Sequence, residues 1–323
     1  MPSAINHQPS AISHEPSAIG YRLLVLVGPT AVGKSAMAIE LAERLGGEII
    51  SADSRYLYRG LDIGTAKPSP ADRARAPHHL IDVTDPDRPW SLAEYQKAAT
   101  TLISEINERQ RLPLLVGGTG QYVRAVLDGW TIPKRESDPG LRSELEAFAE
   151  RDGADALYQR LVEADPAAAA SIDKRNVRRV IRALEVTITT GVPFSAQRNK
   201  NPPGYRLLLI GLTLPRANLY ARIDARIEAM FAAGLVDEVK ALAAKYTWTL
   251  PALSAIGYRQ VGAYLRGEID LDEAKRMIKH DTRRFVRQQA NWFKADDSQI
   301  HWYDADSLKV EKLVGDIIEL QSK

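Results

Sequence analysis

The sequence predicts an α/β fold in which helices flank a parallel β-sheet, with a helical subdomain inserted into it. Short apolar, β-branched runs alternate with segments of helical periodicity, which is the pattern of βαβ units. A glycine-rich loop joins the first such run to a helix. From about Asp138 to Asn199 the alternation stops, and helix formers dominate without any strand pattern.

The first βα unit carries a phosphate-binding loop (P-loop). After the apolar run 23–27 the chain continues as Gly28-Pro29-Thr30-Ala31-Val32-Gly33-Lys34-Ser35. This string fits G-x-x-x-x-G-K-[ST] at every fixed position. The glycines let backbone N–H groups face phosphate oxygens at a helix N-terminus, Lys34 supplies a cation, and the Ser35 hydroxyl can hold Mg²⁺. The loop predicts a P-loop NTPase-like sheet that binds a diphosphate or a triphosphate.

The remaining elements follow in chain order. Further strands are predicted at 47–52, 80–83, 113–116, 206–212 and 300–303. Helices are predicted at 36–45, 92–111 and over most of 216–289. Ser91 as N-cap, with Glu94 three residues later, forms a capping box that opens the helix at 92.

The chain divides into a tail, a core and an insertion. Within residues 1–20 the string Pro-Ser-Ala-Ile recurs at a spacing of seven, but a proline in each repeat excludes a coiled coil, so we expect a disordered tail. Residues 21–137 and 202–323 are expected to form a catalytic core with C-terminal helices. Residues 138–201 are expected to form the inserted helical subdomain.

Composition narrows the class of protein. The 323 residues include no cysteine, which excludes disulfides and cysteine-based zinc sites and is compatible with a reducing cytosol. No run approaches the ~20 apolar residues of a membrane-spanning helix. The net charge is only +2, so a nucleic-acid surface must come from local clusters of cations.

Two loops at the carboxyl edge of the predicted sheet are candidates for chemistry, because ligands of open α/β sheets bind there. Asp53 follows the second strand and can coordinate Mg²⁺ or accept a proton, although an N-cap or Asx turn explains the same residue. The strand 113–116 ends in Gly117-Gly118-Thr119-Gly120, where P-loop ATPases usually carry an aspartate. His78-His79 lacks metal-ligand spacing and neighbouring acids, and we interpret it as structural.

Two cationic segments indicate a polyanionic partner. Five cations fall between Lys174 and Arg182, and Arg175, Arg178, Arg179 and Arg182 have the spacing of one helical stripe. This pattern favours a phosphate backbone over the alternative of a merely solvated face.

From Lys275 to Lys294 seven cations and one acid are interleaved with aromatic residues, which suits single-stranded RNA. The alternative is that the aromatic residues anchor this helix in the core. A glycine-broken turn at 254–260 is expected to expose Tyr258 and Arg259.

Over residues 22 to 303 the chain resembles the tRNA dimethylallyltransferases, also called tRNA isopentenyltransferases. Besides the P-loop, the matching strings are Ser51-Ala52-Asp53-Ser54, Tyr58-Arg59-Gly60-Leu61-Asp62-Ile63-Gly64-Thr65-Ala66-Lys67-Pro68, Pro77 to Val83, Gly117 to Gly120, Arg182 to Val186, Ile256 to Gln260 and Thr282 to Phe293. The tail lies outside the resemblance. Asn291 stands where the family pattern leads us to expect threonine, which we expect to trim a tRNA contact rather than activity.

The resemblance implies transfer of a dimethylallyl group from dimethylallyl diphosphate to the exocyclic N6 amine of the adenosine 3′ of the anticodon in tRNA. It implies that Lys34, Ser35 with Mg²⁺, and Arg222 stabilise the leaving diphosphate. Asp53 would accept the amine proton, Thr30 and Thr119 would line the channel, and the base would flip into it. The implied enzyme is cytoplasmic, and we expect a monomer.

The resemblance, together with the cationic segments, also suggests residues that contact the tRNA anticodon stem-loop. These are Asp53, Ser54, Arg55, Tyr56, Thr119, Arg142, Arg178, Arg179, Arg182, Ile256, Gly257, Tyr258, Arg259, Arg283, Arg287, Gln288 and Trp292. The residues alone leave two rival functions open: a small-molecule kinase that binds ATP in the same loop, and a non-catalytic RNA-binding module.

Overall fold

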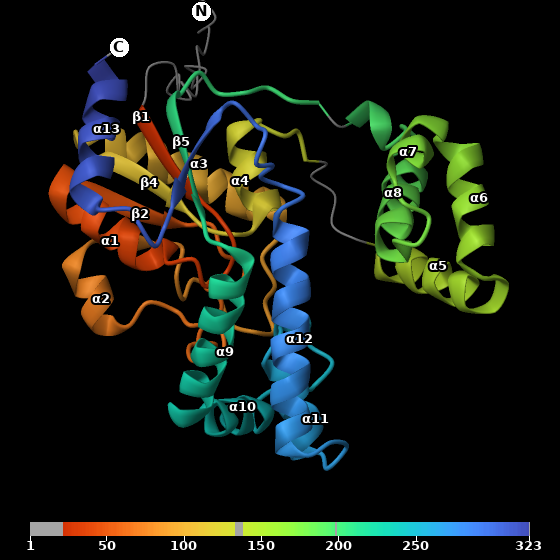
Figure 1. Ribbon diagram of the computed structural model, residues 1–323. Helices are drawn as coiled ribbons and strands as arrows, with labels where there is room; N and C mark the ends of the chain where they lie inside the picture. Colours follow the sequence, from red (N-terminus) through yellow and green to blue (C-terminus); the bar gives the residue numbers. More distant parts are fainter. Residues whose placement is uncertain (1–21, 133–137, 198, 323) are drawn as a thin grey trace, which may run out of the picture.

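The structure, a computed structural model, describes residues 22–132, 138–197 and 199–322 and is built around a six-stranded sheet (Figure 1). The strands are β1 (Arg22–Val27), β2 (Gly47–Ser51), β3 (His78–His79), β4 (Leu112–Val116), β5 (Arg206–Thr213) and β6 (Ile300–Asp304). Their spatial order is β3-β2-β4-β1-β5-β6, and every neighbouring pair is parallel. The predicted parallel α/β fold is confirmed.

One predicted strand is misplaced. Pairing with β2 involves His78 and His79 rather than residues 80–83. Leu80 and Asp82 have φ values of +60° and +56°, and this left-handed conformation cannot continue an extended strand.

Helices cover both faces of the sheet. The core helices are α1 (Lys34–Leu45), α2 (Pro70–Arg75), α3 (Leu92–Glu108), α4 (Gly120–Leu127), α9 (Arg216–Ala232), α10 (Leu235–Ala243), α11 (Tyr258–Leu265), α12 (Leu271–Gln289) and α13 (Val310–Ser322). In β1, Leu24 and Leu26 pack in the cluster that contains α1 and α13, while Leu23 and Val25 pack with α3 and α4. Because β1 is buried on both faces, its residues 23–27 are all apolar.

Local sequence signals place the start of α3 where it was predicted, whereas α3 ends at Glu108 rather than 111 and α1 begins at Lys34 rather than 36. Ser91 Oγ accepts the Glu94 N–H at 3.2 Å, and the Glu94 carboxylate accepts the Ser91 N–H at 2.7 Å, so the capping box of α3 is confirmed. Helix α1 begins directly after Gly33, whose φ of +107° lets the P-loop turn into the helix.

The carboxyl ends of the strands face a group of helices formed by α9 to α12 (Figure 1). Helix α9 follows β5 almost directly, and α12 packs beside both α9 and α11. These helices cover the sheet edge at which the P-loop lies. They leave room there for ligands between the loops and the helices.

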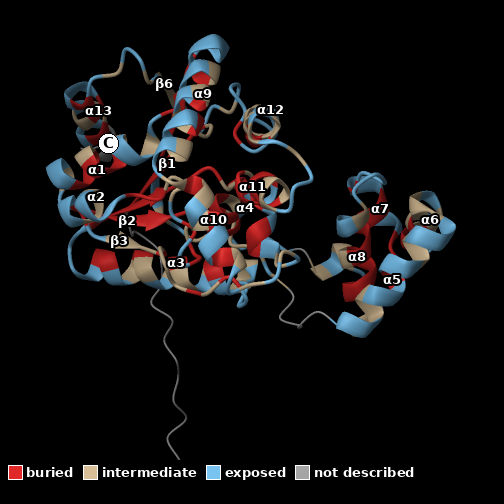
Figure 2. Cartoon of the chain, turned by 90° about the horizontal axis from the view of Figure 1, so that it is seen from below, coloured by how far each residue is buried: buried red, intermediate tan, exposed pale blue. Residues whose placement is uncertain are grey.

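Four helices between β4 and β5 pack around a hydrophobic cluster of their own. They are α5 (Pro139–Asp152), α6 (Ala154–Ala164), α7 (Pro166–Ser171) and α8 (Val177–Thr190). Leu157, Leu161 and Leu184 pack in this cluster. The buried residues of the unit lie on the sides of the helices that face one another (Figure 2). Two chain segments lead to this unit from the sheet, and they pair antiparallel through Trp130 and Lys200.

Two expectations from the sequence concern the N-terminal tail and membrane-spanning helices. The repeat tail, residues 1–20, lies outside the described residues. Within the ranges that are described, no helix has both the length and the apolar character needed to cross a lipid bilayer.

Candidate active site

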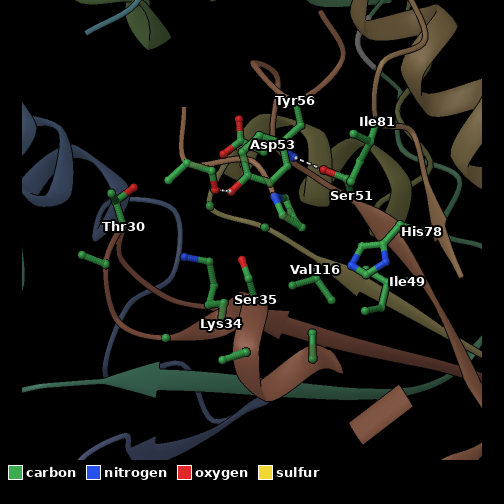
Figure 3. Close-up of a pocket in the computed structure, with 18 of the residues that line it drawn as sticks. Thr30, Lys34, Ser35, Ile49, Ser51, Asp53, Tyr56, His78, Ile81 and Val116 are labelled. Carbon is green, nitrogen blue, oxygen red and sulfur yellow. Dashed lines mark hydrogen bonds between the residues drawn. The ribbon is translucent and has the colours of Figure 1, made fainter. Parts of the chain in front are cut away.

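A cavity of about 330 Å³ lies against the P-loop at the carboxyl edge of the sheet (Figure 3). Lys34 and Ser35 reach into it from the start of α1, and Asp53 and Tyr56 lie on the opposite wall. Ile49, His78 and Val116 line its other end. The cavity therefore has a polar, cationic side at the loop and a more apolar side at the sheet.

The P-loop geometry depends on its first glycine. Gly28 has a φ of +144°, and a Cβ at this position would lie 2.5 Å from the Leu212 carbonyl oxygen. Only glycine fits such a close approach to a neighbouring strand. In the second glycine loop, a Cβ on Gly117 would lie 2.2 Å from the Ala52 carbonyl oxygen, so this loop packs against the backbone that follows β2.

Three cations converge on this cavity. Lys34 Nζ donates to the carbonyl oxygens of Gly28 and Pro29 at 3.0 and 2.8 Å. Burial lowers the pKa of Lys34 to about 8, although the Asp53 carboxylate acts in the opposite direction. Arg222 donates to the Val32 carbonyl at 3.2 Å and pairs with Asp306.

Arg226, the third cation, was not predicted from the sequence. It donates to the Thr65 carbonyl at 2.9 Å and lines the cavity. Because it follows Arg222 by four residues on α9, it lies on the same helix face. The spacing of four residues from Arg222 is the sequence pattern that could have identified Arg226 as a cavity residue.

Asp53 lies where β2 ends. Its Oδ1 accepts the Arg55 N–H at 2.8 Å, so the Asx turn is present. The Asp53 side chain also lines the cavity. Burial, together with the negative charge of Asp53, raises the pKa of Tyr56 to about 12. The Asx turn and the functional interpretation are therefore compatible, because the turn orients the carboxylate at the site.

A second cavity of about 280 Å³ adjoins the first on the side of α9 and α12. Its lining includes Ser54, Arg55, Thr119, Ile256, Gly257 and Phe285. Thr30, Asp53, Gly118 and Arg226 line both cavities. The two cavities therefore meet at Asp53, between the P-loop and the second glycine loop.

Two residues expected to contact RNA do not line the second cavity. Tyr258 is fully buried rather than exposed, and its hydroxyl donates to Glu238 at 2.6 Å, so the predicted exposure is wrong. The reason is that the turn places Tyr258 at the start of α11, facing the core. Tyr56 lines the first cavity and not the second, with its hydroxyl donating to the Ala66 carbonyl.

The cationic stripe of the helical unit is shorter than predicted. Helix α8 begins at Val177 with Asn176 as its cap, so Arg175 precedes the helix and pairs with Asp173. Arg142 and Arg182 both bind the buried Glu185, at 2.9 and 3.1 Å.

The remaining cations expected to meet RNA lie on or near the surface. Arg178 and Arg179 have exposed side chains at the start of α8. Arg259 pairs with Asp281, and Arg283 with Asp224. Arg287 donates to the Tyr220 hydroxyl at 3.3 Å.

The aromatic residues in and just after α12 were expected either to face RNA or to anchor the helix in the core, and the structure contains both kinds. Phe285 and Trp292 are each 38% exposed, whereas Phe293 is buried in the core. Gln288 is also exposed. Phe293 thus anchors the segment that follows α12, while Phe285 on the helix and Trp292 just after it are partly exposed.

The His78-His79 pair has an acidic neighbour after all. His79 Nε2 lies 2.7 Å from the Glu48 carboxylate, which also binds Arg109, so the expectation of no nearby acid is wrong. His78 lines the first cavity. In the described part of the chain, no three histidine, cysteine or acidic side chains gather as a metal site.

Comparison with known proteins identifies the family. The sequence profile described as IPP transferase matches residues 56–296, and that described as isopentenyl transferase matches residues 21–84. The chain therefore belongs to the IPP transferase family and is a transferase of the prenyltransferase class.

Individual relatives support the same family assignment. The chain is 57% identical over 273 residues to the tRNA dimethylallyltransferase of Roseiflexus sp. (strain RS-1), covering 84% of this chain and 90% of that protein. It is 47% identical over 309 residues to the tRNA dimethylallyltransferase of Moorella thermoacetica, covering 93% and 95%.

Solved structures show the same fold. The full-length tRNA isopentenylpyrophosphate transferase from Bacillus halodurans aligns with a TM-score of 0.69 and 42% identity, over 94% of this chain and 96% of that one. A eukaryotic dimethylallyltransferase acting on tRNA aligns with a TM-score of 0.79 and 25% identity, over 93% and 80%.

Proposed function

We propose that this protein transfers a dimethylallyl group from dimethylallyl diphosphate to the exocyclic N6 amine of the adenosine 3′ of the anticodon in tRNA. One observation carries the proposal: two cavities of different character meet at the Asp53 carboxylate. One is lined by the P-loop and cations, and the other opens between loops and the helices α9 and α12. A transfer between two substrates needs such a junction.

The first cavity suits a diphosphate that leaves. As the bond between C1 of the allyl group and the bridging oxygen breaks, negative charge develops on the diphosphate. Lys34, Arg222 and Arg226 lie where they stabilise this charge, together with the P-loop N–H groups. Strand β4 ends at Val116 and is followed by Gly117, so the carboxylate with which ATPases organise water is missing at this position.

The second cavity suits the adenine base, which must leave its stack to enter. The N6 lone pair attacks C1, the C1–O bond breaks with its electron pair going to the diphosphate, and an N6 proton passes to the Asp53 carboxylate. Thr30 and Thr119 lie beside this path, since Thr30 lines both cavities and the Thr119 hydroxyl accepts the Ser54 N–H.

The residues present fit a magnesium ion held largely by the substrate. The Ser35 hydroxyl lines the first cavity beside Lys34, and Mg²⁺ is usually bound by few protein ligands together with phosphate oxygens and water. When bound, the ion would neutralise charge on the diphosphate.

RNA binding in this proposal uses three regions that present cations or line the second cavity. These are the start of α8 with Arg178 and Arg179, the turn at Ile256 and Gly257, and the exposed face of α12 with Arg287 and Gln288. The helical unit α5–α8 would hold the anticodon stem while the base enters the cavity. We further propose that the protein acts as a cytoplasmic monomer.

The test is an incubation with dimethylallyl diphosphate, Mg²⁺ and tRNA, followed by nucleoside mass analysis. N6-(dimethylallyl)adenosine is the expected product. A parallel incubation with γ-labelled ATP tests the kinase alternative. Label transfer from ATP without prenylated adenosine would overturn the proposal, and tight tRNA binding with neither product would favour a non-catalytic RNA-binding protein.

A further inference from the structure

Gln289, near the end of α12, joins three segments that are far apart in the sequence. Its Oε1 accepts the backbone N–H of Thr30 at 2.9 Å, and its Nε2 donates to the Gly118 carbonyl at 3.0 Å. The side chain is 5% exposed. One amide therefore ties the P-loop to the second glycine loop across the point where the two cavities meet.

The bridge depends on the chemistry and the size of the groups that form it. An amide supplies one acceptor and one donor, which match one N–H and one C=O, whereas a carboxylate or an apolar side chain leaves at least one backbone group unpaired. At Gly118 a Cβ would lie 2.3 Å from Gln289 Nε2, so only glycine leaves room for the amide.

We propose that Gln289 is a positioning residue that fixes the gap between the P-loop and the second glycine loop. This inference rests on the proposed function. Thr30 and Gly118 border both cavities, so the gap sets how close the bound diphosphate and the incoming base come to Asp53. Because α12 also carries Phe285 on the second cavity, the amide connects the RNA-facing helix to the diphosphate loop.

The test uses Gln289→Met, which keeps the side-chain length and removes both hydrogen bonds. We expect kcat/KM to fall roughly 10- to 100-fold, since small displacements of reacting groups have effects of this size. The affinity for inorganic pyrophosphate should fall as well, because Thr30 belongs to the P-loop. The Kd for tRNA should stay within about twofold, because the exposed face of α12 is unchanged.

Gln96→Met is the matched control. Gln96 on α3 donates to the Ala125 carbonyl at 2.7 Å, so its amide makes a similar bond away from both cavities. Gly118→Ala disturbs the bridge from its other end and should reproduce the pyrophosphate defect. Thermal unfolding shows whether each variant is folded, and Gln289→Asn, which is too short to reach both loops, replaces any variant that is not.

Two results would overturn the inference. One is pyrophosphate affinity and kcat/KM in the Gln289 variant equal to those of the Gln96 control. The other is loss of tRNA affinity with unchanged turnover, which would make Gln289 an RNA contact only. If the unaltered protein forms no prenylated adenosine, the proposed function fails, while pyrophosphate binding, which needs only the P-loop, still tests the bridge.

Discussion

At the residue scale, Asp53 combines a structural role in a turn with a position at both cavities. Its Oδ1 holds the Arg55 N–H in an Asx turn, and its side chain borders both cavities. The turn fixes where the carboxylate lies. In the proposed reaction, a carboxylate held in this way would receive a proton from the amine that arrives through the second cavity.

Replacing Asp53 with Asn keeps an acceptor for the turn and removes the base. We expect kcat to fall about 100-fold or more, the usual contribution of general-base catalysis, with the tRNA Kd unchanged within about twofold. Single-turnover kinetics and a filter-binding assay measure the two quantities. Weaker tRNA binding with normal turnover would refute the assignment of Asp53 as the base.

Lys34 gives a prediction about pH. Burial lowers its pKa from 10.5 to about 8 in the protein without ligand, so near pH 8 about half of the molecules carry a neutral lysine. A bound pyrophosphate favours the charged form and raises the pKa again. Binding should therefore take up protons near pH 8 and weaken as the pH rises above it.

Calorimetry in two buffers with different ionisation enthalpies measures this uptake. Lys34→Met is the control, since only the titration of pyrophosphate itself remains in that variant. Equal proton uptake by the variant and the unaltered protein would show that Lys34 is already fully charged before binding.

At the element scale, Glu238 on α10 anchors the loop that lines both cavities. Its carboxylate accepts the N–H groups of Asp62, Ile63 and Gly64 at 2.7–3.1 Å, as well as the Tyr258 hydroxyl. Burial beside this carboxylate keeps the pKa of Tyr258 well above its usual value, so the hydroxyl remains a donor. In the next residue of the loop, Thr65, the carbonyl oxygen accepts a hydrogen bond from Arg226, which lines both cavities.

Glu238→Gln should lower the free energy of unfolding by about 1–3 kcal/mol, because the new amide places a donor against donors that were paired with a charged acceptor. Denaturant unfolding measures the change. Asp237→Asn, one residue earlier and exposed on the same helix, is the control and should change stability by less than about 0.5 kcal/mol. Equal stability of the two variants would contradict the anchoring role.

How far the sequence predicts these features depends on whether they are local. The P-loop, the capping box at Ser91 and all the strands except β3 are encoded by neighbouring residues, and they lie where predicted. Gln289, Glu238 and Arg226 act through partners more than 150 residues away, and no periodicity identifies such partners.

Tyr258 shows a second limit of the sequence. A glycine-broken turn shows that the chain bends, but the side of the following helix that faces the core is set by packing. Gly64 illustrates this packing, because a Cβ there would lie 2.6 Å from the Tyr258 ring. The turn itself could therefore be predicted from the sequence, but the burial of Tyr258 could not.

At the scale of the whole molecule, the helical unit α5–α8 extends from the core on two paired segments (Figure 1). If it holds the anticodon stem, Arg178→Ala combined with Arg179→Ala should weaken tRNA binding and reduce the slope of log K against log salt by about 1–2, since each phosphate contact contributes about 0.9. Titrations at several salt concentrations measure the slope.

Arg151→Ala, at an exposed arginine of α5 that pairs with Asp152, serves as the control and should leave the slope unchanged. An unchanged slope in the double variant would mean that the start of α8 faces away from the RNA.

The junction of the two cavities at Asp53 is tested most directly by a crystal structure with an anticodon stem-loop and a non-reactive analogue of dimethylallyl diphosphate. We expect the diphosphate to bind in the P-loop cavity and a flipped adenine to lie in the other cavity, with its N6 within hydrogen-bond distance of Asp53. A diphosphate and an adenine in the same cavity, or an adenine that remains stacked in the RNA, would contradict it.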